Sequence, residues 1–416
     1  MNSEFLFYTI NDGRTIDAAE MTRSLISFAT EFGLEGNIWQ HWLTYNLMTD
    51  ENPFSLACER RQIREDSTLM KLVSSDIAVF REWMRSEPSE LAGGFFSESA
   101  DMLDLMTDYR LPYDNGSVNA AGMHIMDLSS RLAEAGSRKE FCSILTGEYE
   151  KYGAGVYSLY RAFRVAEGAT GEKDSLLVPV AEASDVTFDD LIGYESQKET
   201  LRANTEAFVS GQPANNVLLY GDSGTGKSTS IHALMHDYFD RGLRLIEIGK
   251  QHRSMLPQIM SEIKRRNYKF IIFLDDLSFE ENESDYKELK AMLEGALEKR
   301  EDSVLIYATS NRRHLIRETW RDRNDMEYEQ DVHRSDTMEE KLSLAARFGV
   351  TIYYPKPDPR EYLEIVRSLA ERKGIELSGT DLDDAAREWE LRHGGMSGRT
   401  ASQLITWLEG RQPENE

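Results

Sequence analysis

Asn216-Val-Leu-Leu-Tyr-Gly-Asp-Ser-Gly-Thr-Gly-Lys-Ser-Thr229 is the most informative stretch of this sequence. Its first part, residues 217–220, is apolar and favours a β-strand. The loop after it matches the pattern G-x-x-x-x-G-K-[ST]. Beyond the loop, apolar side chains recur at helical spacing, at Ile231, Leu234, Met235 and Tyr238. A strand, a glycine-rich loop and a helix in this order are the context that a phosphate-binding loop requires.

The glycines of this loop let backbone N–H groups turn inward around an anion, and the following helix points its positive end at the same place. Lys227 is predicted to reach the β- and γ-phosphates of a nucleotide, and Ser228 is predicted to hold Mg²⁺. The loop residues predicted to bind the nucleotide are Gly221, Asp222, Ser223, Gly224, Thr225, Gly226, Lys227, Ser228 and Thr229.

The composition narrows the class of protein. The chain has 416 residues, of which 40% are hydrophobic, so it is long enough for two or three domains that each bury a core. Lys and Arg number 48 against 73 Asp and Glu, which gives a formal net charge of −25. This acidic balance argues against a large nucleic-acid interface, although a local basic groove is compatible with it.

The cysteines and the N-terminal residues indicate the cellular compartment of the protein. Cys58 and Cys142 lie in different regions without a C-x-x-C pattern, as expected of packed thiols in a reducing environment. The first residues lack a basic region followed by an apolar one, and no apolar run approaches the ~20 residues that a membrane span needs. We therefore expect a cytoplasmic protein that does not enter a membrane.

Residues 1–165 are predicted to form a mostly α-helical N-terminal domain. Apolar and aromatic residues recur there at helical spacing, and Gly33, Asn37 and Pro53 mark helix ends. These stripes favour a helical core over the other interpretation, a partner-binding surface. The domain contains no catalytic constellation. Residues 166–185, whose first part is small and polar, are predicted to form a linker.

Residues 186–355 alternate strand and helix patterns, which predicts a parallel sheet in an α/β domain. The run 270–274 is wholly apolar, so we expect a central strand that is buried on both faces. Asp275 follows it at the edge beside the phosphate loop, where it can position Mg²⁺; the alternative is that Asp275 caps the next segment. Asn311 follows another apolar strand, 304–308, and is predicted either to orient an attacking water or to be a turn residue.

Residues 312–416 are assigned from their charge and hydrophobic patterns. The polar stretch 312–340 begins with several arginines and is interpreted either as a contact surface for DNA or an acidic partner, or as a solvated insertion. A further strand is expected at 350–354. Residues 356–410 are predicted to form a small helical lid, and 411–416 a polar tail.

These motifs together resemble the AAA+ superfamily over roughly residues 186–408. Thr187-Phe-Asp-Asp-Leu-Ile-Gly193 is similar to the segment that lines the adenine pocket in that superfamily, which implies adenine contacts for Ile192 and Gly193. The resemblance implies ATP and Mg²⁺ as cofactors. The runs 275–280 and 308–316 look more closely like an uncharacterised bacterial family of predicted AAA+ ATPases, known as a domain of unknown function.

The resemblance also implies roles for three polar residues outside the phosphate loop. Asn311 looks like the first sensor, and Arg399, in Ser-Gly-Arg-Thr, looks like the second sensor on the lid. Arg347, in Ala-Arg-Phe-Gly, looks like the arginine finger that completes a neighbouring subunit's site, which implies a homo-oligomer. The plainer alternatives are an exposed helical residue for Arg347 and a helix-start residue for Arg399.

One departure from the superfamily concerns catalysis. AAA+ hydrolases usually carry Asp-Glu after the second motif strand, whereas this chain has Asp275-Asp276. The Asp276 carboxylate is one methylene shorter, so it is expected to polarise water less well, and Glu280 is a second candidate base. General-base assistance is worth ~10²–10⁴-fold in rate, so the departure bears directly on turnover.

The sequence thus leads to one preferred hypothesis and two alternatives. The preferred one is an AAA+ ATPase that hydrolyses ATP to move its N-terminal domain or a bound partner, which is an unidentified protein or DNA. The first alternative is a nucleotide-gated adaptor, similar to helicase loaders, that binds ATP with little turnover. A kinase is disfavoured because the chain shows no acceptor site and has a lid with Arg399.

Overall fold

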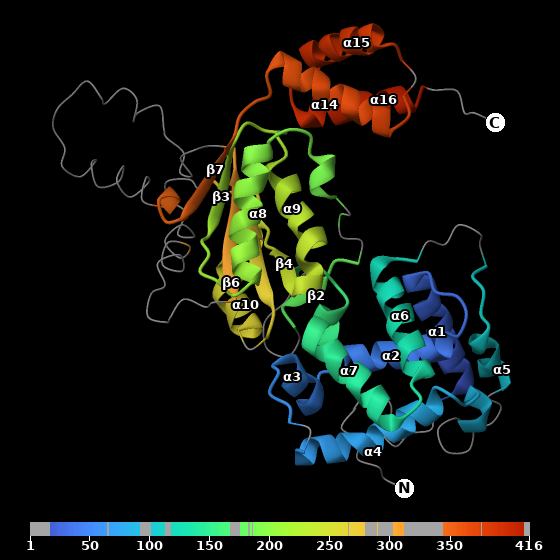
Figure 1. Ribbon diagram of the computed structural model, residues 1–416. Helices are drawn as coiled ribbons and strands as arrows, with labels where there is room; N and C mark the ends of the chain where they lie inside the picture. The colour runs from blue at the N-terminus through green and yellow to red at the C-terminus, as the bar shows by residue number, and fades with distance from the viewer. Residues whose placement is uncertain are drawn as a thin grey trace.

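The architecture combines a helical N-terminal region, an α/β unit and a small helical lid (Figure 1). The computed structural model describes residues 17–64, 66–91, 101–112, 118–166, 175–181, 184, 186–264, 266–278, 289, 303–311, 344–375 and 377–411. The α-helices of the N-terminal region are α1 (Ala18–Phe32), α2 (Ile38–Thr49), α3 (Pro53–Glu59), α4 (Thr68–Trp83), α5 (Asp101–Asp104), α6 (Ala120–Glu134) and α7 (Arg138–Tyr152). The predicted helical character of this region is confirmed.

Local sequence signals set the ends of these helices. The Asp17 side chain accepts hydrogen bonds from the first turn of α1, and Gly33 ends α1 at a φ of 68°, where a glycine is preferred. Asn37 caps α2 in the same way. The aromatic stripes face inward, and Phe32 and Trp39 are completely or almost completely buried. The stripes therefore form a helical core, as predicted.

Seven strands form one sheet in the order β2-β1-β4-β5-β6-β3-β7. Among the strands of the described residues, β1 and β2 alone pair antiparallel, and the other neighbours are parallel. The strands are β1 (Ala162–Val165), β2 (Leu177–Pro179), β3 (Val217–Gly221), β4 (Leu243–Glu247), β5 (Lys269–Leu274), β6 (Val304–Ser310) and β7 (Val350–Tyr354). The predicted parallel sheet is confirmed, with β5 central and apolar. The pair β1–β2 lies outside the range 186–355 predicted for the α/β domain.

Helices cover both faces of the sheet. One face packs against α8 (Glu195–Val209) and α9 (Lys227–Tyr238), which contribute Leu201 and Ile231 to a shared core. The other face packs against α10 (Leu256–Ile263), and its apolar core continues without a break into the N-terminal helices. The N-terminal region and the sheet are therefore built around one common core.

The lid consists of α14 (Pro359–Arg372), α15 (Gly379–Arg392) and α16 (Gly398–Glu409), which pack around their own small apolar core. Figure 1 places the lid at one end of the sheet and the N-terminal helices toward the other end. Within the residues that the structure describes, no helix has the length and apolar character to cross a membrane.

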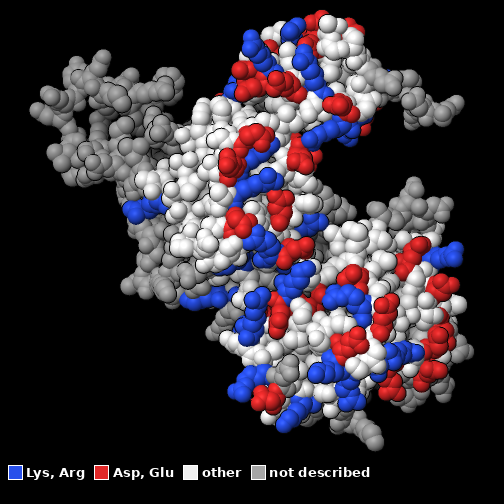
Figure 2. All heavy atoms as spheres, in the orientation of Figure 1, with Lys and Arg blue, Asp and Glu red and all other residues white. Residues whose placement is uncertain are grey.

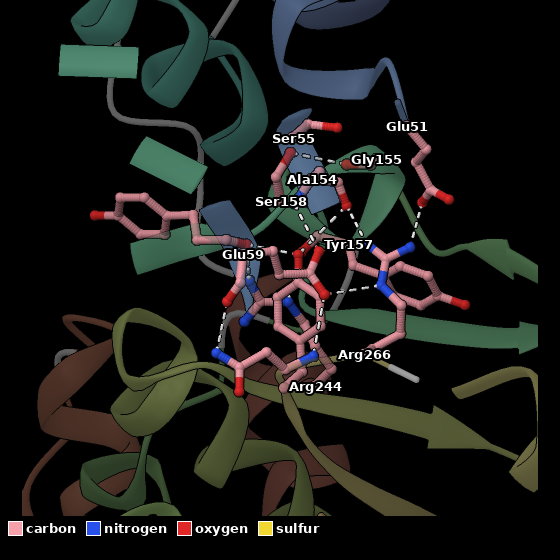
Figure 3. Close-up of polar contacts among 12 residues, drawn as sticks. Glu51, Ser55, Glu59, Ala154, Gly155, Tyr157, Ser158, Arg244 and Arg266 are labelled. Carbon is pink, nitrogen blue, oxygen red and sulfur yellow. Dashed lines mark hydrogen bonds and ion pairs between the residues drawn. The ribbon is translucent and has the colours of Figure 1, made fainter. Parts of the chain in front are cut away.

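A buried ion pair joins the N-terminal region to the sheet (Figure 3). Glu59, at the end of α3, accepts from Arg266 at 3.1 Å and 2.8 Å, and the two side chains are 2% and 8% exposed. The backbone N–H groups of Ala154 and Asn267 donate to the same carboxylate, each at 3.0 Å. All four donors are shared between its two oxygens, so the buried charge of Glu59 is both paired and hydrogen-bonded.

Arg244, on β4, adds a second buried connection. It is fully buried and donates to the carbonyl groups of Tyr157 at 2.6 Å, between α7 and β1, and of Tyr152 at 3.3 Å, at the end of α7. Burial lowers the pKa of Arg244 to about 10, so it stays charged at neutral pH. Gly153 packs so tightly here that a Cβ would lie 1.8 Å from the Tyr268 hydroxyl oxygen. The junction is polar, buried and closely packed.

We expect Glu59→Gln to lower the free energy of unfolding by about 3 kcal/mol, because an amide NH₂ would face donors and buried Arg266 would keep only the more exposed Glu51 as a carboxylate partner. Urea denaturation followed by tryptophan fluorescence measures the change. The matched control is Asp384→Asn, which neutralises an exposed pair with Arg387 and should cost about 0.5 kcal/mol or less. Equal small effects in both variants would mean that Glu59 does not hold the junction.

Candidate nucleotide-binding site

The phosphate loop connects β3 to α9, as the sequence predicted. Gly221 has a φ of 143°, and a Cβ there would lie 2.0 Å from the Tyr354 carbonyl oxygen on the neighbouring strand β7. Gly226, directly before α9, has a φ of 88°, and a Cβ there would lie 2.2 Å from the side chain of Leu191. Both positions need glycine because of backbone conformation and because of close approach.

Lys227 lies folded against the loop. Its ammonium group donates to the carbonyl groups of Gly221 (3.0 Å) and Asp222 and to the Asn311 side-chain oxygen (3.1 Å). An ammonium group has three hydrogens, so these acceptors use its full donor capacity. Burial lowers the pKa of Lys227, because removal from water disfavours its charged form. A phosphate oxygen can replace one of these neutral acceptors and restore the stability of the charge.

Ser228 and Asp275 are in direct contact. The Ser228 hydroxyl donates to Asp275 Oδ1 at 2.7 Å, across 47 residues of sequence. Hydroxyl and carboxylate oxygens are the hard ligands that Mg²⁺ prefers, and protein Mg²⁺ sites commonly use only one or two of them beside phosphates and waters. The donor set therefore fits the predicted Mg²⁺ site. The alternative role of Asp275, capping the next segment, does not account for this contact.

Asp276 and Asn311 also meet. The Asn311 amide donates to Asp276 Oδ1 at 3.0 Å, and its oxygen accepts from Lys227, so the three side chains form a chain of hydrogen bonds. Thr309, at the end of β6, contacts both acidic residues through its hydroxyl. Sequence reasoning did not single out Thr309. Its position two residues before Asn311 was visible, but its contact with Asp275 depends on the register of β6 against β5.

These residues line one cavity of about 450 Å³ between the sheet edge and the lid. Its polar side carries phosphate-loop residues 223–229 together with the acidic pair and Asn311. Its apolar side is formed by Leu191, Ile192, Ile365 and Leu369. A polar end for phosphates and an apolar end for a planar base match the two parts of a nucleotide. Ile192 lines the cavity, whereas Gly193 lies just beyond it with a φ of 78°.

The lid contacts the phosphate loop directly. Arg399 lies at the start of α16 and lines the cavity, and its backbone N–H donates to the Gly224 carbonyl at 3.3 Å. Arg372, on α14, donates at 3.1 Å to Asp190, which also lines the cavity. Tyr194 donates to the carbonyl of Pro355, at the start of the lid connection, at 2.9 Å. The lid thus lines the cavity through Arg399, Ile365 and Leu369, and it contacts the segment 187–193 through Arg372.

The other predicted site residues are placed as follows. Arg347 lies three residues before the start of β7, is half-buried, and is not among the residues that line the cavity. Its predicted role concerns a neighbouring subunit's site, so it stays a prediction. Glu280 and the polar stretch 312–340 lie outside the described residues.

The family comparison covers the sheet, the cavity and the lid. A family model described as "Protein of unknown function (DUF815)" matches residues 159–412, which is more than half of the chain. The match begins just before β1, so it includes the strand pair that precedes the predicted α/β range. The predicted resemblance to an AAA+ family of unknown function is confirmed.

Characterised relatives match more distantly. The proteasome-activating nucleotidase of Methanothermobacter thermautotrophicus is 26% identical over 258 residues, which are 56% of this chain and 60% of that protein. The ATP-dependent zinc metalloprotease FtsH of Aquifex aeolicus is 24% identical over 242 residues, covering 52% and 34%. The replication factor C large subunit of Methanococcus maripaludis is 34% identical over 74 residues, covering 18% and 15%. The chain thus spans less than two thirds of each of these relatives.

Solved structures match at low similarity. The RuvB Holliday junction branch migration motor of Thermotoga maritima is 16% identical, with a TM-score of 0.37, and the match covers 53% of this chain and 63% of that one.

We expect Lys227→Ala to weaken ATP binding by about 100-fold, because charge-assisted hydrogen bonds to the phosphates would be lost. Isothermal titration calorimetry with ATP measures the affinity, and the melting temperature without nucleotide checks the fold. Lys198→Ala is the control, since Lys198 is also buried but pairs with Glu195 on α8. ATP affinity unchanged by Lys227→Ala would contradict the site assignment.

Proposed function

Since the chain belongs to the family described as Protein of unknown function (DUF815), we propose a function from the site itself: an AAA+ protein that binds ATP with Mg²⁺ and hydrolyses it to ADP and phosphate. The observation that carries this proposal is the hydrogen bond between Ser228 and Asp275 beside Lys227. It joins the phosphate loop to a carboxylate at the end of a different strand, which is the arrangement that phosphoryl transfer needs.

Each residue has a proposed part in the reaction. Lys227 and the N-terminus of α9 bind the phosphates, and Ser228 and Asp275 hold Mg²⁺, which neutralises phosphate charge when bound. Asp276 accepts a proton from the attacking water, and Asn311 orients that water near the γ-phosphate. Arg399 contacts the phosphates from the lid.

The moving element is proposed to be the lid rather than the N-terminal region. The N-terminal helices share a continuous core with the sheet and are tied to it by Glu59 and Arg244. The lid has its own separate core and meets the phosphate loop at Gly224. Hydrolysis would therefore change the lid angle and act on a partner, not on the N-terminal helices.

The surface supports a protein as that partner over DNA. Figure 2 shows Lys and Arg side chains interspersed with Asp and Glu over α8 and the lid helices. Nucleic-acid binding needs concentrated positive charge, which this face does not present in its described residues. We propose an unidentified protein partner and, with Arg347 as finger, a homo-oligomer.

The second candidate is the nucleotide-gated adaptor, and the Asp276 contact favours it. The short carboxylate of Asp276 lines the cavity and accepts from the Asn311 amide at 3.0 Å, so one of its oxygens is already engaged by a side chain of the site. A base held in this way would leave ATP bound with little turnover.

We expect Asp276→Asn to lower ATP turnover by about 10²–10⁴-fold while ATP affinity stays within a few fold, because general-base catalysis is lost but the phosphate contacts remain. Steady-state phosphate release and ATP titration measure the two quantities. Asp384→Asn, an exposed lid residue, is the control.

Tight ATP binding by the wild-type chain with no turnover would support the adaptor instead. Turnover that survives in Asp276→Asn would show that another group, such as Glu280, acts as the base.

We expect Arg347→Ala to preserve ATP binding and lower turnover by about 10³-fold, because an arginine finger stabilises charge on the transferred phosphate of the neighbouring site. Native mass spectrometry with ATP tests whether the chain assembles, and Arg387→Ala is the exposed control. Full turnover in Arg347→Ala would remove its assignment as a finger.

A further inference from the structure

We propose that Thr309 is a positioning residue that orients both acidic side chains of the site, Asp275 and Asp276, through its single hydroxyl group. This inference rests on the proposed function, because it gives Thr309 a part in holding Mg²⁺ and in placing the base. It is carried by the contacts of Thr309 and by the backbone conformation of Asp276.

The sheet register brings Thr309 opposite the acidic pair. Leu274 on β5 is paired with Ala308 on β6, so the next residues along each strand, Asp275 and Thr309, face each other at the sheet edge. The Leu277 N–H donates to the Thr309 carbonyl at 2.7 Å, which continues the contact past the end of β5. Thr309 is 2% exposed, so its hydroxyl has little access to bulk water.

The hydroxyl group uses both of its hydrogen-bonding functions. It donates its proton to Asp275 Oδ1 and accepts from the backbone N–H of Asp276 at 3.0 Å. A hydroxyl has one hydrogen and two lone pairs, so it can serve as donor to one acidic residue and as acceptor for the other at the same time. Neither valine nor alanine can make these contacts.

The contact with Asp275 leaves one oxygen for the metal. Ser228 and Thr309 both donate to Oδ1 of Asp275, and neither donates to Oδ2. This fixes the rotation of the carboxylate and leaves Oδ2 available to Mg²⁺ or to a water on it. Groups that orient a metal-binding carboxylate in this way typically affect metal affinity or activity by about 10- to 100-fold.

The contact with Asp276 supports an unusual turn. Asp276 has a φ of 46°, in the left-handed region that residues other than glycine rarely adopt. Such a conformation persists when neighbouring contacts hold it. Here the Thr309 hydroxyl holds the backbone N–H, and Asn311 holds the carboxylate. Thr309 thereby determines the direction in which Asp276 leaves the strand.

The test compares Thr309→Val with Thr309→Ser. Valine has nearly the same shape without the hydroxyl, and serine keeps the hydroxyl without the methyl. The readout is the ATP dissociation constant measured by calorimetry with Mg²⁺ and with EDTA, together with steady-state turnover. We expect Thr309→Val to reduce the gain in affinity from Mg²⁺ by about tenfold, to lower turnover by about tenfold or more, and to leave binding in EDTA unchanged.

Thr309→Ser should restore both the Mg²⁺ gain and turnover to within a few fold of wild type. The matched control is Thr205→Val on α8, which removes a fully buried hydroxyl that contacts the Tyr307 hydroxyl on β6 at 2.9 Å; neither residue lines the cavity. We expect this control to leave the Mg²⁺ gain unchanged. A melting temperature for each variant separates loss of fold from loss of positioning.

Three outcomes would overturn the proposal. A Thr309→Val protein with an unchanged Mg²⁺ gain and unchanged turnover would overturn this inference alone. Equal impairment in Thr309→Ser and Thr309→Val would also overturn it, because shape rather than the hydroxyl would then matter. A wild-type chain that binds no ATP would overturn the proposed function, and this inference with it.

Discussion

The arrangement of the site depends on the parallel register of β5 against β6. β5 is apolar and buried on both faces, so its place in the middle of the sheet is fixed by packing rather than by any ligand. That register places the end of β5 beside the end of β6, and β3 on the far side of β6 delivers the phosphate loop to the same edge. Asp275 reaches Ser228 because three strand ends coincide.

The sheet contacts the N-terminal helices and the lid through different kinds of interaction. Between the sheet and the N-terminal region the apolar core is continuous, and the buried pair Glu59–Arg266 joins the two. Separating them would expose apolar side chains and would leave buried charges without their partners, which is costly. Toward the lid, the contacts are exposed ion pairs such as Arg372–Asp190 and isolated hydrogen bonds such as that of Tyr194 to Pro355. Weak, surface-exposed contacts are the ones that a bound nucleotide can rearrange at little cost.

Sequence reasoning reached the phosphate loop, β5, Asp275 and the lid because each has a local signature in composition or spacing. It did not single out Thr309, whose contacts come from strand pairing, and it did not predict that Leu191, within the segment 187–193, lies against Gly226. It also did not predict that Glu59 and Arg266, 207 residues apart, form a buried pair. In the sequence, each of these residues has the local pattern of an ordinary exposed charge. These contacts join residues that are far apart in the sequence, so no local sequence pattern predicts them.

The short side chain of Asp276 fits its contact with Asn311. A glutamate would carry its carboxylate one methylene further from the turn, beyond the Asn311 amide that now binds Asp276 at 3.0 Å. The left-handed backbone at Asp276 compensates in part, because it redirects the short side chain toward Asn311 and the cavity. Asn311 also accepts from Lys227, so a phosphate that draws Lys227 away frees the Asn311 oxygen. The Asn311 side chain therefore connects Lys227 of the phosphate loop with Asp276.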